Sequence, residues 1–192
     1  MAYHHGNLRA ELLARAEEVV ATDGADALSL RSLARDIGVS HAAPGRHFPD
    51  RLALLDALAV EGFGQLDRTL EAAISGGGTF ENRLNRTALA YVGFATEHPA
   101  LLELMYARKH RDPTVDLRAA SDAAARTLLS LLADSGAAID DPERFGVILL
   151  ACLQGIAALA AGNSLPPQHH PDRLVADAVQ RLLRGSRDGS RG

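Results

Sequence analysis

The chain of 192 residues has little of the residue types that mark secreted, disulfide-bonded or sheet-rich proteins. Its one cysteine, Cys152, excludes an internal disulfide and fits a reducing compartment. It has no tryptophan, only 4% aromatic residues and no alternating strand pattern, which favours helices over sheets. No basic-then-apolar signal sequence stands at the N-terminus, so we expect a cytoplasmic protein.

Positive charge is scarce as well. The net charge of −4 argues against a protein that coats nucleic acid by bulk charge. Residues 1–60 hold six arginines, no lysine and eight acidic residues. Any contact with DNA in this region must therefore depend on a few well-placed cations, on helix N-termini and on histidines.

The sequence lacks the common signatures of enzymes and metal sites. His4-His5 and His169-His170 are adjacent pairs, not the i, i+4 pairs that put two metal ligands on one helix face. The run Ser75-Gly76-Gly77-Gly78 lacks the Lys and Ser/Thr of a phosphate-binding loop, and we interpret it as a linker. No nucleophile elbow or dinucleotide fingerprint is present. We therefore expect no enzymatic activity, no metal and no cofactor.

What the sequence does contain is a helix-turn-helix pattern between Ser29 and Phe48. Ser29 is a good N-cap, and apolar residues follow it at helical spacing: Leu30, Leu33, Ala34 and Ile37. Gly38 suits a helix C-terminus, and Ser40 is predicted to cap a second helix at once. Two helices joined by such a turn fit the second one into the major groove of DNA. The same pattern also fits an ordinary helical hairpin.

The flanks of this pattern carry further signals. Arg46-His47-Phe48 is followed by Pro49, Asp50 and Arg51, and the chain opens with Tyr3-His4-His5-Gly6-Asn7-Leu8-Arg9. Over residues 3–60 the sequence resembles the TetR family of transcriptional regulators, and the opening is similar to one subgroup of it. Gly45 departs from the family, which usually has Tyr there. Because glycine weakens a helix and the tyrosine contact is missing, this departure predicts weakened DNA binding.

The start of the second predicted helix carries the candidate DNA contacts. Amides at a helix N-terminus point towards phosphate, and His41 is placed to reach a base edge or a phosphate. The resemblance implies that His47 and Arg51 touch the DNA backbone, whereas we interpret Phe48 as a core anchor. The predicted DNA-binding residues are Ser29, Arg31, Ser40, His41, Ala42, Ala43, Gly45, Arg46, His47 and Arg51.

The remainder of the chain predicts a helical bundle. Amphipathic patterns with cap or proline signals predict further helices over 50–70, 79–97, 99–110, 115–133, 145–162 and 171–183. With the first helix over 7–23, the expected fold is all-α with about nine helices. We expect a three-helix helix-turn-helix head over 1–50 and a helical effector-binding and dimerisation domain over 51–192.

The segment Phe145–Gly162 is the most apolar of the chain and approaches the length of a membrane span. Its small residues and the preceding Asp140-Asp141 favour a helix inside a bundle or at an oligomer interface. TetR-like proteins commonly dimerise through two such C-terminal helices of each copy. We therefore expect a homodimer and no membrane span.

The second half also carries the larger or polar residues that are candidates for a ligand pocket. These are Tyr91, Phe94, Met105, Tyr106, Phe145 and Gln154. Core packing alone would explain most of them. Because few charges accompany them, the expected effector is an apolar or lightly polar small molecule.

These patterns lead to two hypotheses of function. The first is a dimeric regulator that binds a roughly palindromic operator in double-stranded DNA and is released by a small-molecule effector. The resemblance favours repression over activation. The alternative is a helical ligand-binding or enzymatic bundle whose N-terminal motif no longer binds DNA.

Overall fold

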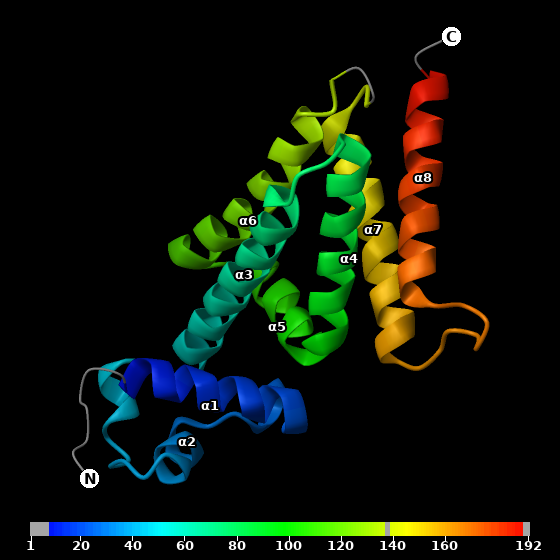
Figure 1. Ribbon diagram of the computed structural model, residues 1–192. Coiled ribbons are helices and arrows are strands. Elements are labelled where there is room, and N and C mark those ends of the chain that lie inside the picture. The colour runs from blue at the N-terminus through cyan, green and yellow to red at the C-terminus, as the bar shows by residue number, and fades with distance from the viewer. Residues whose placement is uncertain (1–7, 137–138, 190–192) are drawn as a thin grey trace. The chain divides into compact units, whose positions relative to one another are not determined.

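The computed structural model describes residues 8–136 and 139–189, which form helices joined by short loops (Figure 1). No strand occurs within these residues, which confirms the all-α fold class. The α-helices are α1 (Leu8–Asp23), α2 (Leu30–Asp36), α3 (Arg51–Ser75), α4 (Phe80–Glu97), α5 (Pro99–Lys109), α6 (Val115–Ala133), α7 (Pro142–Ala161) and α8 (Pro171–Gly189). The predicted helix start at Asn7 and the opening motif from Tyr3 to Asn7 lie outside the described residues.

Side-chain caps and prolines set the start of most helices, as the sequence predicted. The Thr79 hydroxyl accepts a hydrogen bond of 3.2 Å from the Asn82 amide at the start of α4. The Asp141 carboxylate accepts one of 3.0 Å from the amide of Arg144 at the start of α7. Such caps satisfy amides that have no partner within the helix. The last helix runs to Gly189, six residues beyond its predicted end at Leu183.

The first half of the helix-turn-helix forms as predicted. Helix α2 is capped by Ser29 and ends before Gly38, which has a φ of 74°. The Val39 amide donates to the Ala34 carbonyl (2.9 Å), and the Gly38 amide donates to the Arg35 carbonyl (3.2 Å). This pair of bonds is a Schellman motif, whose left-handed residue favours glycine.

The second predicted helix, starting at Ser40, is wrong as an α-helix. Its only helical stretch is a 3-10 turn over Pro44–Arg46, and this accounts for eight α-helices in the described residues instead of about nine. In an α-helix the amide of residue 44 would bond to the Ser40 carbonyl, but Pro44 has no N–H. The Ala43 amide bonds to that carbonyl instead, at 2.9 Å. The tighter i+3 pattern thus replaces the first α-helical turn, and Gly45 adds the cost of a flexible backbone.

Contacts between residues divide the chain into two compact units. The first comprises Met1–Phe63 and Ala100–Ser121, and the second comprises Gly64–Pro99 and Asp122–Gly192. Helices α3 and α6 therefore contribute to both. The predicted boundary between residues 50 and 51 separates a helix-turn-helix head from an effector-binding and dimerisation domain, and it stays a prediction.

In the first unit, α3 and α5 pack closely. A Cβ atom at Gly62 would lie only 2.7 Å from the Met105 sulfur, so this glycine permits the close approach of the two helices. Asp56 and Arg108 form a buried ion pair of 2.6 Å between the same helices. Breaking one partner of such a pair leaves an uncompensated buried charge, so the pair fixes how α5 sits on α3.

In the second unit, α4, α7 and α8 pack side by side (Figure 1). One face of α7 is buried through Phe145, Gly146, Leu149, Leu153 and Ala157. The opposite face is exposed and apolar, with Val147, Ile148 and Leu159 at 69%, 40% and 48% exposure. The bundle-interior interpretation of this helix is therefore correct for one face only.

Among the described residues, α7 is the one helix long and apolar enough to cross a membrane. This is weak evidence for a membrane span, because core helices of soluble proteins pass the same test. The apolar residues of α7 on the side of α4 and α8 are buried and form a regular stripe, which is the pattern of a bundle helix.

Candidate nucleic-acid interface

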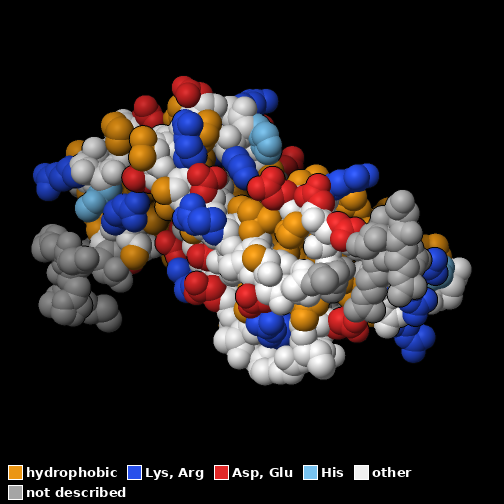
Figure 2. Space-filling model, turned by 90° about the horizontal axis from the view of Figure 1, so that it is seen from above, with side chains coloured by type: hydrophobic (Ala, Val, Ile, Leu, Met, Phe, Trp, Pro, Cys, Tyr) orange, Lys and Arg blue, Asp and Glu red, His pale blue; other side chains and the backbone are white. Residues whose placement is uncertain are grey.

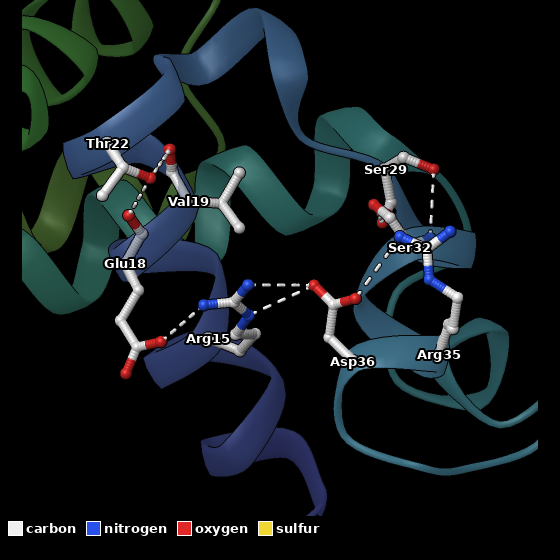
Figure 3. A network of polar contacts seen from close by, with 8 residues as sticks. All are labelled: Arg15, Glu18, Val19, Thr22, Ser29, Ser32, Arg35 and Asp36. Carbon is white, nitrogen blue, oxygen red and sulfur yellow. Dashed lines mark hydrogen bonds and ion pairs between the residues drawn. The ribbon is translucent and has the colours of Figure 1, made fainter.

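A polar network links α1 to α2 in the first unit (Figure 3). The Arg15 guanidinium donates to the Asp36 carboxylate at 3.1 and 3.2 Å and to the Glu18 carboxylate at 2.7 Å. Hydrogen bonds to Glu18, and then to Asp36, raise the pKa of Arg15 above its ordinary value. The guanidinium therefore stays charged, but its exposure keeps the energy of the network small.

The recognition segment, defined as Ser40–His47, lies largely on the surface. Pro44 is its one buried residue, Ala43 is half-buried, and the other side chains are exposed. Phe48 follows it and is 2% exposed, which confirms its prediction as a core anchor. The segment thus presents His41, Arg46 and His47 to solvent while one proline and one phenylalanine hold it to the core.

A shallow cleft joins the recognition segment to the start of α2. It has a volume of 340 Å³ and is lined by Ser29, Arg31, Ser32, Arg35 and His41. We call it the anion cleft, because its lining combines two guanidinium groups, two hydroxyls and an imidazole and no carboxylate. Such donors suit the phosphate oxygens of a nucleic-acid backbone.

The anion cleft includes two residues that the prediction missed, Ser32 and Arg35. Arg35 lies four residues after Arg31, and residues at this spacing share a helix face. That spacing is the signal that could have found it. The Asp36 carboxylate approaches Arg35 at 3.4 Å, but the Arg35 side chain is 74% exposed and keeps its reach towards solvent.

Arg51 differs from its predicted role as a phosphate clamp. Its guanidinium donates to the carbonyls of Leu28 (3.0 Å) and Ala25 (2.6 Å) and lies 3.5 Å from the Asp26 carboxylate. Arg51 therefore holds the turn that leads into α2. The fork of guanidinium donors suits this task, because it reaches several acceptors at once.

His47 lies away from the anion cleft, on a second hollow of the first unit. This hollow of 380 Å³ is lined by residues that include Arg9, His47, Phe48 and Asp50. The Arg9 guanidinium stands 5.5 Å from the centre of the Phe48 ring, within the range of a cation–π contact. The structure thus brings Ser29, Arg31 and His41 together but does not gather the whole predicted set in one cleft.

The charges of this region are mixed. Residues 1–60 hold six arginines and eight acidic residues, and Figure 2 shows basic and acidic side chains interspersed over the one face of the molecule that it displays. Two of the arginines among residues 8–60, Arg15 and Arg51, are engaged with acceptors inside the first unit. The groups that remain for binding phosphate are the exposed Arg46 and the anion cleft, which includes the exposed Arg31.

The predicted ligand residues divide between the two units. Met105 packs against Gly62, and the Tyr106 ring meets Phe63 edge-on with centroids 6.2 Å apart, both within the first unit. The others, Tyr91, Phe94, Phe145 and Gln154, lie in the second unit. Of these, Phe94 borders a cavity of 330 Å³ between α3 and α4, and Phe145 borders another of 400 Å³ between α7 and α8. Within residues 8–136 and 139–189, no cluster of His, Cys, Asp or Glu could hold a metal ion.

Comparison with known protein families identifies the family of this chain. A model of bacterial regulatory proteins of the tetR family matches residues 12–58. A model of the tetracyclin repressor-like C-terminal domain matches residues 84–182, which is about half of the chain. The chain belongs to the TetR family. It is thereby placed among DNA-binding transcriptional regulators, and the family resemblance predicted from residues 3–60 is confirmed.

Two solved structures are similar to this chain over nearly its whole length. A protein of unknown function from Rhodococcus sp. RHA1 is 42% identical over 97% of this chain and 98% of its own, with a TM-score of 0.89. A TetR-family regulator from Marinobacter aquaeolei VT8 shares the fold at 18% identity, covering 91% and 94% of the two chains, with a TM-score of 0.72. The nucleoid occlusion factor SlmA of Pectobacterium carotovorum is 32% identical over 100 residues, or 52% of this chain. The chain spans about half the length of the curated relatives it matches.

Proposed function

We propose that the chain is a ligand-responsive repressor that binds a palindromic operator as a homodimer and is released by a small molecule. The observation that carries the DNA-binding part is the anion cleft, whose lining includes Arg31, Arg35 and His41 and no acidic residue. The exposed recognition segment continues this surface through Arg46. The proposal assigns no enzymatic activity and a cytoplasmic location.

The exposed apolar face of α7 supports the dimer. Val147, Ile148 and Leu159 lie on one side of a helix whose opposite side is buried in its own unit. A contiguous apolar face of this kind marks a protein–protein interface. With two copies related by a twofold axis, the two heads would bind half-sites of opposite orientation, which requires a palindrome.

Selection of bound duplexes from a random DNA pool by the full chain tests this function. We expect enrichment of one palindromic motif, and a double variant Arg31→Ala/His41→Ala that enriches nothing. The matched control is Arg118→Ala, which removes an exposed arginine outside the recognition surface. Enrichment without a palindrome would contradict the dimer, and no enrichment by wild type would contradict DNA binding.

A second candidate is a helical ligand-binding or enzymatic bundle whose N-terminal motif no longer binds DNA. The irregular recognition segment and the acidic excess of residues 1–60 favour it. This candidate predicts ligand binding by a protein that enriches no duplex, so the same selection separates the two.

A further inference from the structure

The cavity between α3 and α4 in the second unit has a lining with a distinct chemistry. Its volume is 330 Å³, within the range of small-molecule sites. We call it the α3–α4 cavity, and its lining includes Gln65, Thr69, Gly93, Phe94, Glu97 and His98. No Lys or Arg is among its lining residues, and Glu97 is its one acidic residue.

The Glu97 carboxylate is available to a ligand. Glu97 is exposed at the end of α4, and within the described part of the chain no Lys or Arg pairs with it. An anionic guest would be repelled by this carboxylate, and a neutral guest would gain no ionic attraction from it. A cationic group would compensate it.

An aromatic side chain stands beside this carboxylate. Phe94 borders the cavity, and its ring pairs with the His98 ring at a centroid distance of 5.1 Å and an angle of 41°. Because Phe94 is only 5% exposed, it supplies a buried apolar wall of the cavity, and the attraction for an ammonium group comes from the Glu97 carboxylate. The Thr69 hydroxyl adds an acceptor, since its proton is donated to the Gln65 carbonyl at 2.9 Å.

From this lining we infer that the α3–α4 cavity binds a small organic cation, with its ammonium group at Glu97 and its apolar part against Phe94 and Gly93. The inference rests on the proposed effector response and replaces the apolar effector expected from sequence with a cationic one. Gly93 leaves room for the apolar part, because a Cβ atom there would meet no heavy atom within 4 Å.

Calorimetric titration of the full chain at pH 8 tests this site. The probe is benzyltrimethylammonium, and phenylacetate serves as the anionic counterpart of similar size. We expect saturable millimolar or tighter binding of the cation and none of the anion. Absence of saturable cation binding, or equal binding of both probes, would overturn the inference.

Two variants locate the binding. Glu97→Gln is expected to weaken the cation about tenfold. The matched control Glu71→Gln, which removes an exposed carboxylate of the same unit away from the cavity, is expected to leave it unchanged. Gly93→Leu fills the open space and is expected to abolish binding with a Tm at or above that of wild type, since leucine is the better helix former.

Cation binding that survives both Glu97→Gln and Gly93→Leu would place the probe elsewhere and overturn the site. Duplex selection without any probe is run on the same protein. Failure of that selection counts against the proposed DNA binding alone, whereas failure of the titration counts against the cavity alone.

Discussion

The residues before Gly38 and those after it form the two halves of one helix-turn-helix, yet only the first half is a regular α-helix. In α2, the cap, the apolar spacing and the C-terminal glycine all favour the same structure. After Gly38, the missing amide of Pro44 and the flexibility of Gly45 oppose the helix that Ser40 would start. Consequently, contacts with residues distant in the sequence hold the second half. They are the burial of Phe48, the Arg9 contact on its ring and the hydrogen bonds of Arg51 to the turn that leads into α2.

If long-range contacts hold the second half in place of regular local structure, removing the Phe48 ring should have the largest effect on the free energy of unfolding. Phe48→Ala is expected to lower the free energy of unfolding by about 3–5 kcal/mol, because a large aromatic at 2% exposure leaves a cavity. Urea denaturation followed by circular dichroism measures this. A loss below about 1 kcal/mol would mean that the recognition segment does not depend on its anchor.

Arg51 distinguishes an internal clamp from a DNA contact. Arg51→Ala is expected to cost about 2 kcal/mol of stability through its lost hydrogen bonds, and to weaken DNA binding without changing its salt dependence. Arg46→Ala is the comparison, because an exposed phosphate contact should reduce the slope of log K against log salt by about 0.9.

Arg51→Lys adds a second measure. Lysine keeps the charge but not the fork of donors, so we expect it to fail to restore either stability or affinity. Full restoration by lysine, or a reduced salt slope for Arg51→Ala, would show that Arg51 binds phosphate after all.

The turn between the two halves depends on the backbone of Gly38. Gly38→Ala is expected to destabilise the protein by about 1–2 kcal/mol, since φ is 74° there and a Cβ atom strains the left-handed region. Thermal unfolding of the two proteins measures the difference. Equal stability would show that the turn relaxes into another conformation.

The smallest expected effect has the opposite sign and lies in the second half. At Gly45 the backbone is outside the left-handed region, and a Cβ atom would meet no heavy atom within 4 Å. Gly45→Ala is therefore expected to stabilise the protein by about 0.4–1 kcal/mol, mostly by restricting the unfolded chain. Differential scanning calorimetry can resolve this gain, and a clear loss would reveal a constraint on residue 45.

The sequence was informative wherever neighbouring residues decide the structure. Thr79, Asp141 and Pro171 mark helix starts through bonds or steric preferences that span only a few residues. Arg51 could not be interpreted in this way, because its acceptors lie 23 and 26 residues away. The choice between an internal and a phosphate contact depends on tertiary structure, to which local spacing gives no access.

The site shows the same limit. Arg31 and His41 were predicted, but the cleft that joins them and includes Arg35 depends on how the turn at Gly38 folds back. The exposed face of α7 was also hidden from sequence, because a helix that is apolar all round has no pattern to show which side is covered. Pro44, by contrast, is a local signal, because its missing N–H removes a hydrogen bond that an α-helix starting at Ser40 would need.

The most direct measurement is the fluorescence anisotropy of labelled DNA from immediately upstream of the protein's own gene, with wild type and Gly45→Tyr at two salt concentrations. We expect sequence-selective binding by wild type that weakens steeply with salt, because phosphate contacts release counterions. Gly45→Tyr should bind more tightly and unfold at a higher Tm, since the space at residue 45 is open. Absence of selective, salt-sensitive binding by both proteins would contradict the assignment of the recognition segment and the anion cleft as a DNA interface.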